Sequence, residues 1–429
     1  MKRASRAAPG SLAALGLLLL GALLGLWTAL LQREAAAQRA PGPRLPPEPP
    51  GRRPPPGPWG WGRSPPARGE SRGGQKTFRA LLAVPGREER AAEGRSAPGG
   101  SPLPGAASPV QRGIFWSREL EEQVPPGFAA EEAAAWLSAA RAARVASLER
   151  GACGRSSNRL ARLSDGSRAC VRYGINPEQI QGEALSYHLA GVLGMQERLP
   201  PMALSLVETR GRQWEPVREE LRGSHWAEGA VVSLTRWVDN LTDVVAPAPW
   251  GAEAGAATGR RLQPLSAGEL GALPPSQLVE LVQWSDLILF DYLTANFDRL
   301  VSNLFSLQWD PRVMRRATSN LLRAPDGGLV FMDNEAGLVH GYRLLAMWDP
   351  YNEPLLRSVC VFREGTAQRV AELHRRRSAA AELRRRYRAR EPLWARLGFL
   401  SERQAELLQA RVDFVHRHIA HCRAQAAAL

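Results

Sequence analysis

The pattern of apolar and polar positions separates an uncharged N-terminal segment from a polar stretch and a long, folded region. Residues 11–31 form an apolar run without a charged side chain, which is about the length that crosses a bilayer as a helix. Lys2, Arg3 and Arg6 precede this run, and positive charge before a span keeps that end in the cytoplasm. The sequence predicts a cytoplasmic tail at residues 1–10 and a signal anchor at residues 11–31. A cleaved signal peptide is the alternative.

The polar stretch from residue 32 to about residue 110 is dominated by Pro, Gly, Arg and Ala, as in "PGPRLPPEPPGRRPPPGPWGWG". A chain of this composition buries too little apolar surface to offset the entropy lost on ordering. We predict a disordered stem between the membrane segment and the folded region.

The folded region begins with helical and then strand-like periodicity. The Ala-rich stretch from Ala129 to Gly151 is predicted to be helical. Alternating apolar residues on both sides of Asp165-Gly166 predict a β-hairpin. Asn176 as a cap and Pro177 at the first helical position predict the start of the next helix.

Further along the chain, residues 229–238 have the pattern of a strand, residues 274–293 that of a long buried helix, and residues 327–337 that of a strand after a turn. The remainder is helical and rich in Arg. A chain of 429 residues is too long for one ordinary core. We therefore predict an α+β protein with two lobes, at residues 111–240 and 241–429.

The charge of the chain predicts an anionic partner. The formal net charge is +14, and Lys occurs only at Lys2 and Lys76. Nucleic acid, heparan-like glycans and phosphate all fit this charge, but an N-terminus directed to the secretory pathway argues against nucleic acid. The basic run from His374 to Arg390 is interpreted as a solvated helix face, with binding of heparan or an acidic substrate as the alternative.

The cysteines and one sequon bear on the compartment. Four cysteines in an oxidising lumen predict two disulfides, and they allow three pairings. Closeness in the chain favours Cys153 with Cys170 and Cys360 with Cys422. Asn240-Leu241-Thr242 is a glycosylation sequon.

Two carboxylates and one amide have the spacing of a phosphoryl-transfer site. Asp298 and Asn303 are five residues apart, as in the catalytic loop of protein kinases. Asp333 follows an apolar strand, where kinases place a metal-binding Asp. Upstream, Arg172 ends a strand and Glu183 lies on a helix, in the order of the kinase phosphate-binding cation and its helix carboxylate. The simpler readings are that Asp298 acts as a helix cap or forms a salt bridge with Arg299, and that Asp333 lies in a plain turn.

Four stretches of the sequence carry a family resemblance: "GIFWSRELEEQVPPGF", "NPEQIQGEALSYHLAGVLG", "DYLTANFDRLVSNLF" and "VFMDNEAG". They resemble the four-jointed box proteins, which are secretory-pathway kinases related to the Golgi casein kinase group. The resemblance implies an atypical, two-lobed protein-kinase-like fold in a Golgi type II membrane protein, with release by proteolysis and secretion. It also implies ATP with Mg²⁺ or Mn²⁺ as cofactors, and cadherin repeats of the Fat and Dachsous kind as substrates in planar polarity and growth signalling.

The resemblance also assigns roles by position. Asp298 is then the catalytic residue, Asp333 and Asn303 are metal ligands, and Glu183 takes the role of the helix carboxylate. Kinases place a Lys at the phosphate-binding position, and the region after residue 76 has none. Arg172 is the best substitute, although its planar guanidinium differs from a compact ammonium. A catalytically weak, secreted signalling ligand with a kinase fold is the alternative function.

Overall fold

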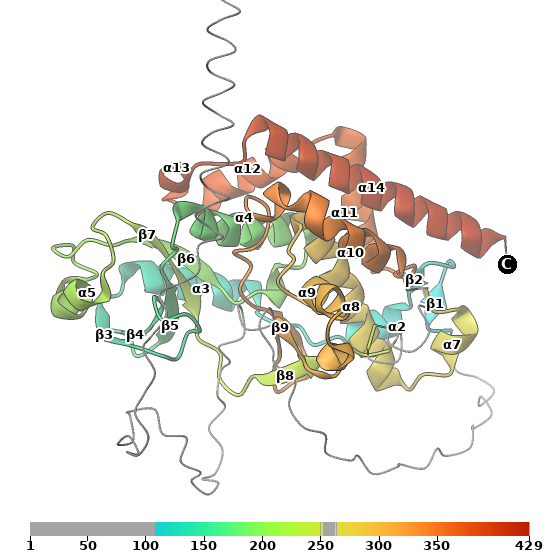
Figure 1. The fold of residues 1–429 in the computed structure, drawn as a ribbon, viewed down its shortest axis with the longest axis horizontal. Coiled ribbons are helices and arrows are strands. Elements are labelled where there is room, and N and C mark those ends of the chain that lie inside the picture. The colour runs from blue at the N-terminus through green and yellow to red at the C-terminus, as the bar shows by residue number, and fades with distance from the viewer. Residues whose placement is uncertain (1–107, 249, 252–261, 263, 429) are drawn as a thin grey trace, which may run out of the picture. The chain divides into compact units, whose positions relative to one another are not determined.

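The computed structural model describes residues 108–248, 250–251, 262 and 264–428 (Figure 1). The predicted tail, the signal anchor and nearly all of the stem lie outside the described residues. Val110, the last residue assigned to the stem, already pairs with Trp116 between β1 (Val110–Gln111) and β2 (Phe115–Trp116). Within the described part of the chain, no helix is long and apolar enough to cross a membrane.

The first lobe is built on an antiparallel sheet with the strand order β3-β4-β5-β7-β6. Its strands are β3 (Val145–Glu149), β4 (Arg159–Leu163), β5 (Arg168–Arg172), β6 (Met202–Leu206) and β7 (Val231–Arg236). The predicted hairpin at Asp165-Gly166 is confirmed as the β4–β5 turn. Because side chains alternate along a strand, Ala169 and Val171 enter a core with α3 (Ala130–Ala142) and α5 (Arg218–Ser224), and the intervening positions face the opposite way.

The prediction of one helical stretch from Ala129 to Gly151 is wrong in its second half. Helix α3 ends at Ala142, and residues 145–149 form β3. Val145 is fully buried and pairs with Leu163 of β4, so packing against the sheet overrides the local preference of an Ala-rich sequence for helix. Residues 150–158 therefore form a loop between two antiparallel strands.

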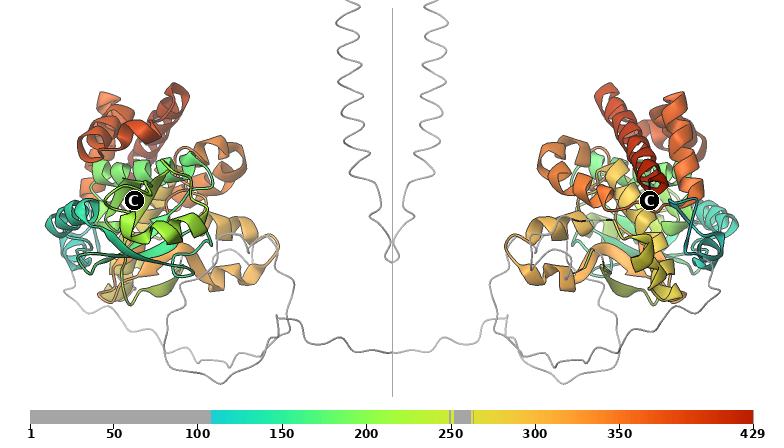
Figure 2. Two further views of the ribbon diagram at one scale, coloured as in Figure 1. Left: turned by 90° about the vertical axis from the view of Figure 1, so that its left-hand side faces the viewer. Right: turned by 90° about the vertical axis from the view of Figure 1, so that its right-hand side faces the viewer.

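Helix α4 (Pro177–Leu193) packs between the first sheet and the C-terminal helices. Asn176 caps it by accepting a hydrogen bond from the backbone of Glu178, and Gly194 ends it in a left-handed conformation, as the sequence predicts for the cap. The C-terminal helices α11 (Glu364–Arg376), α12 (Ala379–Arg390) and α14 (Glu402–Ala427) cover one side of the domain in all views (Figures 1 and 2). Helix α4 is consequently buried on two opposite sides.

The second lobe is organised around α8 (Pro275–Thr294), whose side chains are buried from Leu281 to Thr294. A three-stranded sheet of β8 (Thr242–Val245), β9 (Ala317–Arg323) and β10 (Leu329–Phe331) lies beside α9 (Leu300–Ser306). Helix α10 (Leu345–Arg357) packs on α8 and α9. The N-terminal strands and α2 (Arg118–Gln123) pack on this lobe, where Trp116 donates to Ser285 of α8 at 3.1 Å. The chain passes from the first sheet to the second between Arg236 and Thr242.

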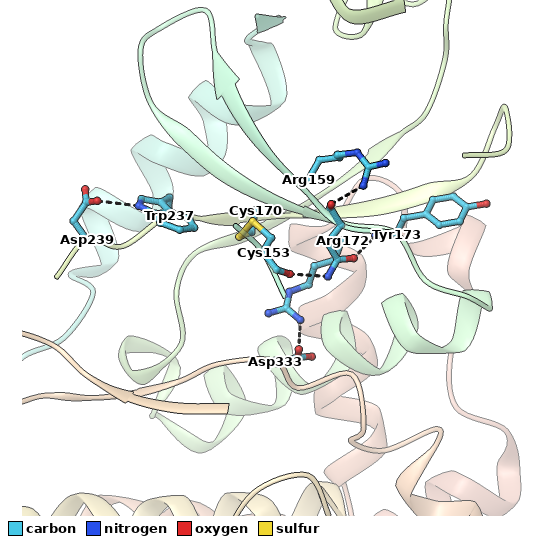
Figure 3. Close-up of a disulfide and its surroundings, with 9 residues drawn as sticks. Cys153, Arg159, Cys170, Arg172, Tyr173, Trp237, Asp239 and Asp333 are labelled. Carbon is cyan, nitrogen blue, oxygen red and sulfur yellow. Dashed lines mark hydrogen bonds and ion pairs between the residues drawn. A yellow bond between two sulfur atoms is a disulfide. The ribbon is translucent and has the colours of Figure 1, made fainter. Parts of the chain in front are cut away.

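The disulfides are those favoured by closeness in the chain. Cys153 bonds to Cys170, and Cys360 bonds to Cys422. The first bond ties the loop between β3 and β4 to β5, two residues from Arg172 (Figure 3). The second fixes the last helix to the second lobe.

Candidate active site

Arg172 lies at the end of β5 on the sheet face that is turned toward α4. Its guanidinium forms an ion pair with Asp333 (Figure 3). Burial acts to lower the pKa of Arg172, but the charges of Asp333 and Glu183 together raise it. The structure thus brings the predicted phosphate-binding cation and the predicted metal ligand together across the two lobes.

Glu183 lies on α4, is buried, and accepts a hydrogen bond of 2.5 Å from the backbone N–H of Asn334. The close approach depends on Gly182, because a Cβ there would meet the carbonyl oxygens of Glu335 at 2.7 Å and Gly337 at 2.8 Å. Burial raises the pKa of Glu183, and the charge of Arg172 opposes this effect. Glu183 therefore holds the turn that carries Asp333, and the ion pair of Arg172 goes to Asp333 instead.

Asp333 has a backbone conformation that favours glycine, with φ of 50°. Strained residues of this kind occur where the surrounding structure fixes a functional side chain. One carboxylate oxygen of Asp333 pairs with Arg172, whereas Oδ1 is buried and has no hydrogen-bond partner among the described residues. An unpartnered, buried carboxylate oxygen is a ready ligand for a hard divalent cation.

Asp298 lies between α8 and α9 and is held by Asn320, which donates to its Oδ2 at 2.9 Å. Burial, and next the charge of Asp333, raise the pKa of Asp298 to about 7. The two predicted carboxylates are therefore close enough to repel each other, which is typical of a site that a divalent cation completes. The simpler reading, in which Asp298 pairs with Arg299, is wrong, because Arg299 pairs with Asp291.

Arg299 accounts for much of the polar end of α8. It is fully buried, and it donates to the backbone oxygens of Asn320 at 3.1 Å and Met332 at 2.9 Å and to the side chain of Asn334 at 2.5 Å. This single guanidinium joins the end of α8 to β9 and to the turn of Asp333. Its role is to position the site.

Asn303, the second predicted metal ligand, lies on α9. It is buried, and its Nδ2 has no hydrogen-bond partner within the described ranges. None of the hydrogen bonds of the described residues joins Asn303 to Asp298 or Asp333. Its role as a ligand stays a prediction.

Sequence reasoning missed Arg155, which lies in the loop between β3 and β4. Arg155 forms an ion pair with Glu335. Burial lowers the pKa of Arg155, and the charge of Asp333 opposes this effect. The loop was missed because β3 was predicted as helix. The glycines in "GACGRSSN" are the sequence signal for a loop that approaches a ligand with its backbone.

Two hydroxyls of β7 were also missed. Ser233 lies opposite Arg172 and Thr235 opposite Cys170 in the sheet register, so these side chains share one face. The hydroxyls of Ser233 and Thr235 are both buried and lack partners among the described residues. The alternation in "VVSLTR" was the available signal.

These orphaned groups fit a nucleotide and a divalent metal. Ser233 Oγ and Thr235 Oγ1 offer donors and acceptors on the sheet side, while Arg172 and Arg155 offer positive charge beside them. Asp333 Oδ1 offers a metal ligand from the opposite lobe. The arrangement can place a phosphate chain between two cationic groups and a metal-binding carboxylate.

The order of elements is the one that the sequence predicts for a two-lobed, protein-kinase-like α+β fold. A sheet with a cationic strand end and a carboxylate-bearing helix precedes a helical lobe that supplies Asp298 and Asp333. The family model of the four-jointed box protein middle domain matches residues 131–425. The chain belongs to the four-jointed box protein family.

This chain is similar to two named relatives in sequence and to two solved structures in fold. The chain is 60% identical to Four-jointed box protein 1 of Homo sapiens over 424 residues, and this alignment covers 96% of each protein. It is 33% identical over 358 residues to the Extracellular serine/threonine protein kinase four-jointed of Drosophila melanogaster, which covers 73% of this chain and 61% of that protein. The Golgi casein kinase with Mn/ADP bound has a TM-score of 0.46 at 11% identity, covering 71% of this chain and 81% of that chain. The structure of hydra Fam20 with sugar has a TM-score of 0.46 at 14% identity, and the match covers 71% of this chain and 94% of that chain.

Proposed function

We propose that this chain is an ATP-dependent Ser/Thr protein kinase that acts in the lumen of the secretory pathway. The observation that carries the proposal is a pair of neighbouring carboxylates. Asp333 pairs with Arg172 through one oxygen and has a buried Oδ1 without a partner among the described residues, and burial together with the charge of Asp333 raises the pKa of Asp298. The name of the Drosophila relative, an extracellular serine/threonine protein kinase, supports the same activity.

Each residue of the site then has a chemical task. Arg172 and Arg155 bind the phosphates, while Asp333, with Asn303, holds the metal. Mg²⁺ or Mn²⁺, when bound, neutralises charge on the phosphates and on the transferred group. Asp298 accepts the hydrogen bond of the acceptor hydroxyl and orients it for attack. Glu183 fixes the turn of Asp333 through the backbone of Asn334.

The proposed acceptors are Ser or Thr residues in cadherin-repeat ectodomains of the Fat and Dachsous kind, with effects on planar polarity and growth signalling. Membership of the four-jointed box protein family supports this choice. The proposed location is the Golgi membrane, with the folded domain in the lumen, anchored through residues 11–31 and released by proteolysis. Asn240 is exposed in the turn before β8, which suits glycosylation in that compartment.

Exposed arginines on α12 support a heparan-like glycan as a further partner. Arg384, Arg385 and Arg388 are exposed on this helix. Of these, Arg385 pairs with Glu382, whereas Arg384 and Arg388 lie over the rings of Phe399 and Trp394. Arginines held by ring contacts keep their hydrogen-bond donors available for sulfate or carboxylate groups.

The second candidate function is a secreted signalling ligand of low catalytic activity. One observation favours it: the cation of the site is Arg172, and its guanidinium pairs with Asp333 in the structure. A metal at Asp333 would compete with that ion pair, which would weaken nucleotide binding.

The test is phosphate transfer by the purified full chain. It would be incubated with radiolabelled ATP, Mg²⁺ or Mn²⁺, and cadherin repeats, beside Asp333→Ala as the inactive control. Transfer by the parent chain that is absent in the variant supports the kinase. Equal signalling to cells by both proteins, with no transfer by either, would establish the ligand function instead.

A further inference from the structure

A cavity of about 140 Å³ lies beside α4, and its lining includes His188 but neither Glu183 nor Asp333. Its apolar wall comes mainly from α3 and the start of β6, with Ala133, Ala134, Leu137 and Met202. Its polar wall contains His188 of α4 and Arg390 at the end of α12. The cavity thus lies where an N-lobe helix, α4 and a C-terminal helix meet.

His188 is the unusual group in this cavity. Its side chain is buried, with 3% exposed, and neither ring nitrogen has a hydrogen-bond partner among the described residues. An imidazole has one donor and one acceptor when neutral, and leaving such groups unpaired in the interior costs free energy. Burial, and then the charges of Arg386, Arg390 and Arg141, lower its pKa to about 3. His188 is therefore a neutral, unsatisfied group in positive surroundings.

The positive charge around His188 is only partly balanced. Arg141 is paired with Glu391 at 3.1 Å. Arg386 is held by the neutral side chain of Gln196. Arg390 is exposed and forms no ion pair among the described residues, although its backbone oxygen accepts from Arg141 at 3.0 Å.

The acidic residue at the cavity does not cancel this charge. The carboxylate of Glu197 is turned to Arg198 at 4.0 Å and to Arg363 at 3.9 Å. The cavity consequently combines an apolar wall with a net positive, hydrogen-bonding wall.

We propose that this cavity is a binding site for a small organic anion, a carboxylate or phosphate monoester attached to one ring-sized apolar group. The anionic end accepts hydrogen bonds from His188 and Arg390, and the apolar group packs on Ala133, Ala134 and Leu137. A cavity of about 150 Å³ accommodates one benzene-sized group, which matches the volume here. The proposal does not depend on the kinase activity.

The position of the site couples it to the turn of Asp333. His188 and Glu183 are five residues apart on one helix, and Glu183 holds the backbone of Asn334. A ligand that binds one position of α4 more tightly than another shifts the helix toward that position. Binding of a ligand beside His188 is therefore a route to regulate the position of the Asp333 turn.

The test is calorimetric titration of the full chain with benzoate, its uncharged analogue benzamide, and inorganic phosphate. We expect saturable benzoate binding at one site, at least tenfold weaker benzamide binding, and weaker binding of phosphate alone. Arg390→Ala should weaken benzoate at least tenfold, and Ala134→Trp should abolish binding by filling the cavity. Arg388→Ala, on the same helix but outside the cavity, is the matched control and should bind benzoate as the parent does.

Three results would overturn the proposal. Benzamide binding as tight as benzoate would show an apolar cavity without anion recognition. Phosphate as tight as benzoate would remove the role of the apolar wall. Benzoate binding that survives both Arg390→Ala and Ala134→Trp would place the ligand elsewhere. Both substituted residues are at exposed positions of helices, so the variants are expected to fold, and a thermal unfolding curve for each would verify this.

Discussion

The two buried sides of α4 differ in how charge is balanced. On the side of Glu183, every guanidinium close to the site has a carboxylate partner: Arg172 pairs with Asp333 and Arg155 with Glu335. On the side of His188, the neighbouring arginines outnumber their carboxylate partners, and the imidazole has none. A ligand on the Glu183 side must replace existing ion pairs of the protein, whereas an anion on the His188 side meets hydrogen-bond donors that have no carboxylate partner.

This difference predicts different ligands for the two sides. Exchanging ion pairs is favourable when the ligand brings both signs of charge, as a metal–nucleotide complex does, because the carboxylates and the guanidiniums each regain a partner. A simple anion would satisfy only the arginines and leave Asp333 and Glu335 uncompensated. The balanced side is therefore suited to a metal with phosphates, and the positive side to an anion alone.

The largest effect is expected from Asp333→Ala, which breaks the balance on the Glu183 side. Loss of the metal ligand should impair both nucleotide binding and transfer, with a fall in kcat/KM of about 10⁴-fold, since a catalytic metal contributes several kcal/mol. Stabilisation by ATP with Mn²⁺, read as a shift in Tm, should disappear. Asp165→Asn, which removes a carboxylate at the β4–β5 turn, is the control and should retain the shift. A normal shift in Asp333→Ala would place the metal elsewhere.

The elements that support this comparison were only partly predictable from the sequence. The β4–β5 hairpin and the cap of α4 were predicted correctly, because Asp165-Gly166 and Asn176 act within a few residues of themselves. Strand β3 was not, because its residues become a strand only by pairing with β4. Because β3 was not predicted, the loop after it was not recognised. That loop carries Arg155, which belongs to the site through its ion pair with the distant Glu335.

The polar networks were even harder to predict from the sequence. Asp298 and Asp333 were found because kinase spacing marks them, but three of the four residues that Arg299 binds, Asn320, Met332 and Asn334, lie more than twenty positions away. No local sequence pattern shows that both ring nitrogens of His188 lack partners among the described residues. That fact follows from the positions of α3 and α12, which the local sequence does not encode.

The second prediction sharpens the roles of the two carboxylates. Asp298→Asn should lower kcat by about 10³-fold, as expected for loss of a catalytic acid–base group, while the Tm shift with ATP and Mn²⁺ remains. A variant that loses the Tm shift as well would show that Asp298 is needed for metal binding.

The same substitution tests the raised pKa of Asp298 through the pH dependence of stability, without an activity assay. The pKa of this carboxyl is raised in the folded protein, so its ionisation destabilises the fold as the pH rises through about 7. Without metal, Asp298→Asn should therefore gain stability relative to the parent between pH 6 and pH 8. Urea unfolding at both values measures the change, and a constant difference would contradict the raised pKa.

The third prediction concerns the cation. Arg172→Ala should weaken nucleotide binding and lower kcat/KM by about 10²-fold, the effect of removing one donor to a developing charge. Arg172→Lys should retain or raise activity, because a compact ammonium releases Asp333 more easily than a planar guanidinium that pairs with it. Arg168→Ala, at the other end of β5, serves as the matched control. Unchanged nucleotide affinity in Arg172→Ala would assign the phosphates to Arg155 alone.

The smallest effect is expected on the His188 side, and it appears in stability rather than activity. Because the pKa of His188 is lowered to about 3 in the folded protein, only the unfolded chain takes up this proton between pH 6.5 and pH 3. The parent should therefore lose stability at this site as the pH falls below 6.5, by about 2 kcal/mol at pH 5. His188→Leu cannot bind the proton, so its free energy of unfolding should gain that amount relative to the parent between pH 7.5 and pH 5.

Urea unfolding of both proteins at the two pH values measures this difference. His421→Gln, at an exposed position on α14, is the control for replacing a histidine outside the cavity. Benzoate sharpens the result. An anion bound beside the imidazole favours its protonated form, so saturating benzoate should reduce the loss of stability of the parent at pH 5, and should have no such effect on His188→Leu. An equal pH dependence in the parent and His188→Leu would mean that His188 has a partner or an ordinary pKa. The contrast between the two sides of α4 would then fail on the His188 side, which no sequence pattern indicates.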